Sequence, residues 1–229
     1  MRTDPRHRPS HAPQAVASGG MYVWYAAYGA NTDATRLGQY LRRCREPAAP
    51  LASRAVELSG VVYFATESPV WGGGRGFYDP EEPGTVYARG HLITLGQFAD
   101  IAAQEMYRDP ATAPHRDSRL TEAVTHGRVR LGPGWYETVV CAGDVDGVPL
   151  LTFTAPWTLG EVELREPAEA YVRLIANGLR ASGAWAAEDI AAYLAGCPGA
   201  VGRYTADDVL GLLAEGPGRL PPTPSGEPN

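Results

Sequence analysis

Residues 21–31 read Met-Tyr-Val-Trp-Tyr-Ala-Ala-Tyr-Gly-Ala-Asn, a run of aromatic, β-branched and small residues that ends abruptly at Gly29. Apolar and aromatic side chains then recur at helical spacing, at Leu37, Tyr40, Leu41 and Cys44. This pattern predicts a strand, a tight turn and a helix. The first N–H groups of a helix have no partner within it, so such a junction favours a carboxylate or a phosphate. Gly29 lets the backbone bend sharply and approach a ligand closely.

The length and charge of the chain limit its class. It has 229 residues and a formal net charge of −6, which suits one domain with a sizeable core, with or without tails. The acidic balance argues against nucleic-acid binding, because phosphate backbones attract basic surfaces. No stretch approaches the ~18 apolar residues of a membrane helix. We therefore expect no nucleic-acid and no membrane partner.

Cysteine usage and the chain ends indicate where the protein works. Three cysteines, at positions 44, 141 and 197, are odd in number and far apart, which does not suit a disulfide framework. The N-terminus lacks the apolar core of an export signal, so we expect a reducing, cytoplasmic setting. Residues 1–20 and 216–229 are poor in large apolar side chains and are predicted to be disordered tails around a folded domain at 21–215.

Periodicity between the tails predicts strands and helices. Strands are expected at 22–27, 58–65, 85–94, 136–142 and 149–155, and helices at 33–43, 95–107, 168–182, 186–196 and 205–214. This order predicts an α+β fold, a small mixed β-barrel flanked by helices. Residues 108–132 are polar with charges of both signs, and we interpret them as an insertion that forms either a lid or a surface loop.

Glu105 is the strongest catalytic candidate. On the helix expected at 95–107, the inward face carries Leu95, Phe98, Ile101 and Ala102, and Glu105 follows on that same face. A carboxylate there is costly to desolvate unless it is paired or opens into a cavity. Burial would raise its pKa toward neutrality, which suits a general acid/base. The alternative is a glutamate at the helix end whose stem packs while its carboxylate reaches water.

The segment Tyr28-Gly29-Ala30-Asn31, followed by Arg36-Leu37, resembles the Tyr-Gly-Ser-Asn loop that opens γ-glutamylcyclotransferase-like proteins. Three later features follow in the family's order and extend the resemblance over residues 21–200. The first is the strand-like segment 90–94, followed by a helix that ends at Gln104-Glu105-Met106. The second is Gly134-Trp135-Tyr136 before a strand at 137–142, and the third is Pro167–Tyr171 with Ile175 and Gly178.

The resemblance implies a metal-independent cleavage of a γ-glutamyl amide. The α-amine of the glutamyl group attacks its own γ-carbonyl, which closes a five-membered ring and releases 5-oxoproline and an amine. The family's catalytic glutamate falls on Glu105, and the N–H groups of residues 29–31 would hold the α-carboxylate or polarise the carbonyl. The family's loop serine is Ala30 here, so one hydroxyl contact is missing while backbone contacts survive.

Three further residues are candidates for substrate binding. Arg75 lies in the glycine-rich stretch 71–78; it either clamps a carboxylate at a pocket wall or belongs to a flexible hairpin connection. Tyr136 either places its hydroxyl over the site, as the family's matching tyrosine does, or begins a half-buried strand. Tyr171, within the late helix, is either a core residue or a polar partner of the loop.

Alternatives to this function remain open. The same scaffold could carry another amide-bond enzyme, such as a deacylase, an amidohydrolase or a natural-product tailoring catalyst, or a binding module without turnover. His-Glu-x-x-His and Gly-x-Ser-x-Gly motifs are absent, so we expect no metal, no cofactor and no serine nucleophile. The expected partner is a small γ-glutamyl or related amide; the oligomeric state, including a homodimer, is left open.

Overall fold

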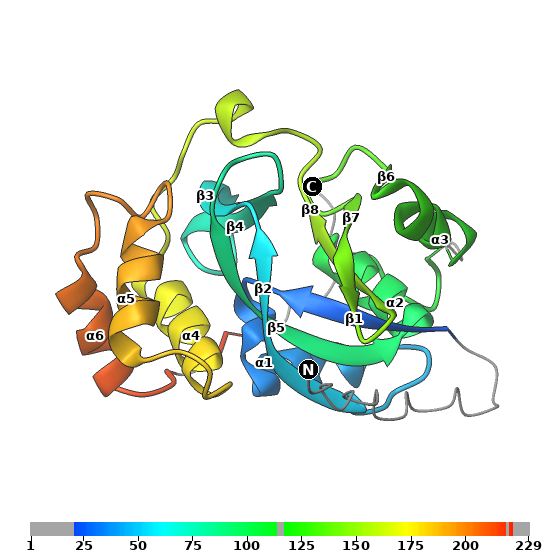
Figure 1. Ribbon diagram of the computed structural model, residues 1–229, viewed down its shortest axis with the longest axis horizontal. Helices are drawn as coiled ribbons and strands as arrows, with labels where there is room; N and C mark the ends of the chain where they lie inside the picture. The colour runs from blue at the N-terminus through cyan, green and yellow to red at the C-terminus, as the bar shows by residue number, and fades with distance from the viewer. Residues whose placement is uncertain (1–20, 114–116, 219, 222–229) are drawn as a thin grey trace, which may run out of the picture.

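The computed structural model describes residues 21–113, 117–218 and 220–221. The tail predicted at 1–20 and most of that predicted at 216–229 lie outside this part of the chain. Eight strands form two sheets here (Figure 1). The larger sheet contains, in order across it, β2 (Ala52–Ser59), β5 (Thr85–Thr94), β1 (Tyr22–Ala27), β8 (Val148–Thr154), β7 (Thr138–Val145) and β6 (Arg128–Arg130). The smaller sheet pairs β3 (Val61–Ser68) with β4 (Gly73–Asp79).

The central strand β1 is apolar along its whole length because both of its faces are buried. It pairs antiparallel with β5 and parallel with β8. Side chains of a strand alternate between its two faces, and β1 accordingly contributes Val23, Tyr25 and Ala27 to one hydrophobic core and Trp24 and Ala26 to another.

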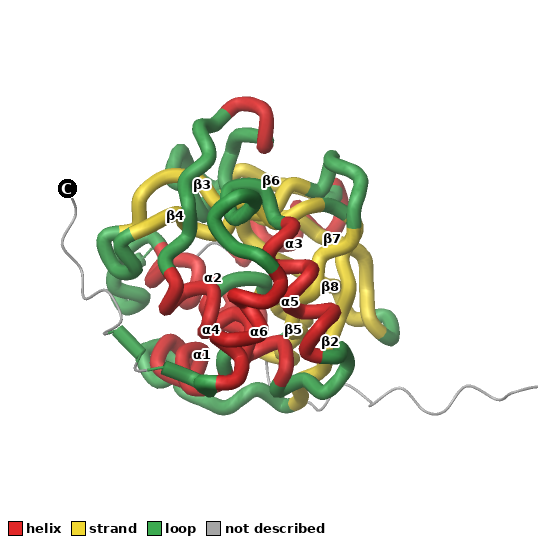
Figure 2. Tube along the Cα trace, turned by 90° about the vertical axis from the view of Figure 1, so that its left-hand side faces the viewer, coloured by secondary structure: helices red, strands yellow, loops and turns green. Residues whose placement is uncertain are grey.

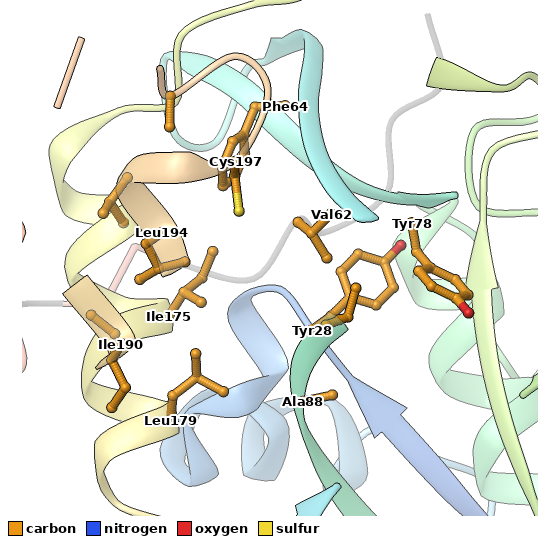
Figure 3. Close-up of a cluster of buried hydrophobic side chains, with 14 of the residues drawn as sticks. Tyr28, Val62, Phe64, Tyr78, Ala88, Ile175, Leu179, Ile190, Leu194 and Cys197 are labelled. Carbon is orange, nitrogen blue, oxygen red and sulfur yellow. The ribbon is translucent and has the colours of Figure 1, made fainter. Parts of the chain in front are cut away.

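Helices cover both faces of the larger sheet. The core around Tyr25 receives side chains from α1 (Ala34–Leu41), α2 (Leu95–Glu105) and α3 (Asp117–His126). The core around Trp24 receives them from α4 (Glu169–Arg180), α5 (Ala187–Gly196) and α6 (Ala206–Ala214), which gather on one side of the molecule (Figure 2). Figure 3 shows Ile175, Leu179, Ile190 and Leu194 in the second core, which also includes Tyr28 and Val62.

The predicted α+β class is confirmed, and several elements match their expected bounds. The strands expected at 22–27 and 85–94 are β1 and β5, and Thr94 and Gln97 form the capping box that begins α2. The described strands do not close into the expected barrel but form two separate sheets.

The single strand expected at 58–65 is divided at Gly60. Gly60 has a φ of +127°, a backbone conformation that favours glycine, and a Cβ there would collide with the carbonyl of Asp79. The chain therefore leaves the larger sheet at Ser59 and enters the smaller one at Val61. This break separates the two sheets.

The glycine-rich stretch at 71–78 is not a flexible loop. From Gly73 onward it forms β4, which is buried along its whole length. Its glycines leave room for the backbone of a neighbouring segment. A Cβ at Gly73 would lie 2.7 Å from the backbone N of Ala168, and one at Gly74 would collide with the carbonyl of Arg165. The glycines therefore serve close packing rather than flexibility.

The interpretation of 108–132 as an insertion that forms a lid or surface loop is wrong for much of that segment. It contains α3 and the edge strand β6. Leu120 and Ala123 of α3 are fully buried, and Val129 of β6 is largely buried. The segment completes the core beneath the edge of the larger sheet.

Candidate active site

One pocket brings together residues from distant parts of the chain. The bend after β1, strand β4, the end of α2 and the start of α4 all contribute to its wall. Every candidate site residue of the sequence analysis lines it: Tyr28, Gly29, Ala30, Asn31, Arg75, Glu105, Tyr136 and Tyr171. Their proximity is an observation, whereas their roles remain predictions.

A short turn lies between β1 and the helix that was expected to begin at Asp33. Residues Ala30–Thr32 form a 3-10 turn, η1, and α1 begins only at Ala34. The side chain of Asp33 caps α1 by accepting a hydrogen bond of 2.8 Å from the N–H of Arg36. The N terminus of α1 is thus already capped, while Gly29, Ala30 and Asn31 line the pocket.

Tyr171 explains why the bend carries a glycine. A Cβ at Gly29 would lie 2.8 Å from the Tyr171 hydroxyl oxygen. That oxygen accepts a hydrogen bond of 3.3 Å from the N–H of Gly76 and another from the N–H of Ala30. Tyr171 therefore joins the bend to β4, and it is at once a buried residue and a polar partner of the loop.

Tyr136 contacts the same glycine of β4 as Tyr171 does. Its hydroxyl donates a hydrogen bond of 2.9 Å to the carbonyl of Gly76. Burial holds the pKa of Tyr136 well above its ordinary value, so this hydroxyl stays protonated and donates. Tyr136 precedes β7 rather than beginning it.

Glu105 is the last residue of α2, and its half-buried side chain faces the pocket. The Asn31 side-chain Nδ2 donates to Glu105 Oε1 at 3.0 Å and contacts the Tyr25 hydroxyl at 3.1 Å. Burial raises the pKa of Glu105 above its ordinary value, while Arg36, hydrogen bonds from Tyr40 and Asn31, and Arg75 partly offset that rise. A carboxylate of raised pKa is a stronger base than an ordinary glutamate.

A second layer of hydrogen bonds holds Asn31. The His91 Nε2 lies 3.2 Å from the carbonyl oxygen of Asn31, and its Nδ1 lies 2.8 Å from the Ser53 hydroxyl. A carbonyl only accepts, so we assign the proton to Nε2 and the acceptor role to Nδ1. Burial lowers the pKa of His91 to about 4, so the ring is neutral at physiological pH. Sequence reasoning placed His91 in a strand but missed this contact.

Two arginines line the pocket, and sequence reasoning proposed only one of them for it. The Arg75 guanidinium lies 4.1 Å from the centre of the Trp135 ring. The Arg36 guanidinium lies 5.3 Å from the Tyr40 ring centre and 5.7 Å from that of Trp71. In the sequence, Arg36 follows the segment Tyr28–Asn31, and this was the only indication that Arg36 belongs to the pocket.

Aromatic side chains form much of the remaining wall and were not foreseen as such. They are Tyr25, Tyr40, Trp71, Tyr107, Trp135 and Phe153. Tyr107 follows the end of α2 with a φ of +57°, a left-handed conformation that is uncommon for residues other than glycine. With this backbone conformation, the Tyr107 ring packs edge to face against Trp135.

Two features are absent from the described residues. They contain no group of three or more His, Cys, Asp or Glu side chains placed to hold a metal ion. None of their helices has both the length and the apolar character needed to span a lipid bilayer.

Comparison with known proteins gives limited similarities. No protein-family model matches the chain. A protein of Arabidopsis thaliana named histone deacetylase 5 is 28% identical over 200 residues, which are 75% of this chain and 30% of that protein. The chain therefore spans less than a third of that relative's length.

Three solved structures are similar to this one. A gamma-glutamyl cyclotransferase has a TM-score of 0.46 and 16% identity, over 85% of this chain and 99% of the other. An uncharacterized protein of Homo sapiens has a TM-score of 0.48 and 17% identity, over 83% and 98%. YkqA of Bacillus subtilis has a TM-score of 0.38 and 18% identity, over 70% and 49%. At this level of similarity, function has to be inferred from the pocket itself.

Proposed function

We propose that this protein is a γ-glutamylcyclotransferase-like enzyme, which cleaves a γ-glutamyl amide into 5-oxoproline and a free amine. The observation that supports this most is the contact between Glu105 and Asn31. It joins a carboxylate of raised pKa to the backbone bend within one pocket. Glu105 and the bend after β1 thereby line the same space.

The proposed reaction joins two groups of one substrate molecule. The α-amine nitrogen attacks the γ-carbonyl carbon, a carbon–nitrogen bond forms, and the original amide bond breaks. Glu105 takes the proton that the attacking nitrogen loses and gives one to the leaving nitrogen, so protons balance and no outside reactant is needed. Because both reacting groups belong to one molecule, correct folding of the glutamyl chain supplies much of the rate.

The surroundings of Glu105 fit this proton transfer. Burial raises its pKa, which makes the carboxylate a stronger base toward the attacking amine, and the carboxylic acid that results can then protonate the leaving nitrogen. The N–H groups of Gly29 and Asn31 are proposed to stabilise the oxygen of the attacked carbonyl, since the N–H of Ala30 already donates to the Tyr171 hydroxyl. Tyr171 and Tyr136, which bind the N–H and the carbonyl of Gly76, are proposed to keep the pocket wall in position.

The experiment that tests the function is a mass-spectrometric screen for 5-oxoproline. The folded protein is incubated with γ-glutamyl amino acids, γ-glutamyl amines and glutathione, and heat-denatured protein serves as control. At least one compound should release 5-oxoproline, and the activity should persist in EDTA. Absence of 5-oxoproline across the panel would contradict the proposal, and a loss in EDTA that zinc restores would indicate metal-dependent chemistry instead.

The raised pKa of Glu105 predicts opposite pH trends for turnover and stability. Turnover should rise with pH through that pKa, because only the ionised carboxylate accepts a proton. A carboxyl group whose pKa rises on folding stabilises the fold below its unfolded pKa, and this stabilisation is lost as pH rises through the folded pKa. The neutral variant Glu105→Gln should therefore resist urea better than wild type at neutral pH, and the difference should vanish below about pH 4. A wild-type advantage at neutral pH would contradict the assignment.

A further inference from the structure

Three side chains stand in a row across the larger sheet. Ser53 of β2 is opposite His91 of β5, and His91 is opposite Tyr25 of β1. Directly opposite residues of neighbouring strands project from the same face of a sheet. Accordingly, the Ser53 hydroxyl lies 2.8 Å from His91 Nδ1, and the ring centres of His91 and Tyr25 are 6.4 Å apart. The proton transfer proposed above uses none of these three side chains.

Asn31 of the bend contacts two members of this row. Its carbonyl oxygen accepts a hydrogen bond of 3.2 Å from His91 Nε2, and its side-chain Nδ2 lies 3.1 Å from the Tyr25 hydroxyl. The same Nδ2 donates to Glu105 Oε1 at 3.0 Å. The row therefore holds Asn31 at its backbone and at its side chain, and Asn31 connects the row to the proposed base.

The turn by itself does not fix Asn31. Within the 3-10 turn, backbone hydrogen bonds of 3.0 Å and 3.2 Å end on the carbonyls of Gly29 and Ala30. The carbonyl of Asn31 instead takes a donor from His91. The side-chain Oδ1 of Asn31 is buried and accepts no hydrogen bond from the described residues. The rotation of the Asn31 amide is thus set by its Nδ2 and by the backbone that His91 holds.

Ser53 keeps His91 in the tautomer that this contact needs. A carbonyl oxygen cannot donate, so Nε2 carries the ring proton and Nδ1 accepts from the Ser53 hydroxyl. His91 is 1% exposed, and burial lowers its pKa to about 4. Since the pKa of Glu105 is raised above its ordinary value of 4.5, the ring is neutral while Glu105 ionises. His91 is therefore a steady donor to Asn31.

We infer that His91 is a positioning residue for the proposed reaction: through the carbonyl of Asn31 it holds the Asn31 amide against Glu105 and so fixes the orientation of that carboxylate. The inference rests on the proposed function for its catalytic consequence. The chain of hydrogen bonds runs from Ser53 on the edge strand β2 through His91 and Asn31 to Glu105. A change at the edge of the sheet therefore reaches the reacting group.

The direction of the effect follows from the charge of Glu105. The hydrogen bond from Asn31 stabilises the ionised carboxylate and lowers its pKa, which opposes the larger rise caused by burial. When the Asn31 amide loses its support and turns away, this opposing contribution is lost. The pKa of Glu105 then rises further, and the carboxylate loses its fixed orientation.

The other groups that act on Glu105 keep their charge while it titrates. Arg36 and Arg75, which both lower its pKa, stay protonated. The remaining groups are tyrosines with raised pKa values, which stay neutral below about pH 9: Tyr25, Tyr40, Tyr107, Tyr136 and Tyr171. A shift in the titration of Glu105 between variants of His91 therefore reports on Asn31.

Two substitutions of His91 separate its two contacts. The side-chain nitrogen of glutamine takes the place of Nε2, so His91→Gln keeps a donor to the carbonyl of Asn31. The side-chain oxygen of asparagine takes the place of Nδ1, so His91→Asn keeps an acceptor for Ser53 but removes that donor. The pKa of Glu105 is measured by carbon NMR titration of the carboxyl groups, with Glu105→Gln to assign its signal. It should rise in His91→Asn and stay near the wild-type value in His91→Gln.

Turnover should follow the same order. In His91→Asn, kcat for 5-oxoproline release should fall about tenfold, less than the hundredfold that a misplacement of about 1 Å can cost. The pH at which kcat reaches half its maximum should move upward together with the pKa of Glu105. His91→Gln should restore both toward wild type, which a merely space-filling role of His91 would not predict.

A variant at the sheet edge tests the same chain without altering the buried ring. Ser53 is exposed, so Ser53→Ala should fold, and it keeps the test decisive should His91→Asn fail to fold. Without the hydroxyl, the ring proton can move to Nδ1, which leaves Nε2 unable to donate. The pKa of Glu105 should rise in Ser53→Ala, by less than in His91→Asn.

Ile93→Val is the matched control for lost stability. Ile93 lies in the same strand and in the core around Tyr25, is 1% exposed and does not line the pocket. The lost methylene should lower the midpoint of thermal unfolding and leave kcat and the pKa of Glu105 unchanged. An unchanged pKa of Glu105 in both His91→Asn and Ser53→Ala, or a rise in Ile93→Val as large as theirs, would overturn the inference.

The NMR titration and the turnover assay separate this inference from the proposed function. A raised pKa of Glu105 in His91→Asn, with no 5-oxoproline from wild type, would overturn the function and retain the positioning of Glu105 by His91. Release of 5-oxoproline by wild type and His91→Asn at equal rates, with coinciding titrations of Glu105, would retain the function and overturn the inference.

Discussion

Replacement of Glu105 by glutamine is expected to reduce 5-oxoproline release by about a thousandfold, within the range that positioned acid–base groups contribute. Glutamine keeps the shape of the side chain and can still contact Asn31, but it neither accepts the proton of the attacking amine nor returns one. The loss should appear in kcat, measured by mass spectrometry under substrate saturation. Affinity for N-glutaryl-alanine, an analogue of γ-glutamyl-alanine that lacks the attacking amine, should change only a few-fold, because the other residues that line the pocket remain.

The matched control for this variant lies on the same helix. Asp100 of α2 is 2% exposed and pairs with Arg45 at 2.7 Å, outside the proposed active-site pocket. Asp100→Asn should lower the midpoint of thermal unfolding, since it weakens a buried ion pair, yet keep kcat. If Glu105→Gln turned over substrate at the wild-type rate, Glu105 would not be the base. Equal losses of kcat in both variants would indicate a general disturbance of α2.

Glu105 could be proposed from the sequence because the pattern that indicates it lies within one helix. Helical periodicity places Glu105 on the inward face of a helix whose capping residues, Thr94 and Gln97, are recognisable in sequence. Strand β1 was equally recognisable from its aromatic and β-branched run. In both elements, the burial pattern follows directly from the spacing of neighbouring residues.

The features that were missed depend on contacts between distant segments. The glycines of β4 suggested a loop, but they are required because the backbone around Arg165 and the ring of Tyr171 pass over that strand. His91 supports the bend only because β5 pairs with β1 and places its ring against Asn31. Arg36 is buried partly by Trp71 and Pro221. Periodicity within one segment carries no information about such partners.

The second large expected effect concerns how the pocket is held together. Gly178 of α4 lies against η1, and a Cβ at this position would lie 2.7 Å from the backbone N of Asp33 and collide with Thr32. Backbone atoms cannot move aside as a flexible side chain does. Gly178→Ala should therefore destabilise the fold by about 2 kcal/mol despite the better helix propensity of alanine.

In Gly178→Ala, the rate of 5-oxoproline release should fall by more than the loss of folding stability alone would cause. Displacement of η1 moves Asn31 and the N–H groups of the bend away from Glu105, and a shift of about 1 Å can cost a hundredfold in rate. Gly211→Ala in α6 is the matched control, because no atom of another segment lies within 4 Å of the added Cβ. It should stabilise the protein by about 0.5–1 kcal/mol and leave turnover unchanged. Urea unfolding and 5-oxoproline release measure the two effects. A Gly178→Ala protein that matches wild type in both would mean that α4 does not fix the position of the bend.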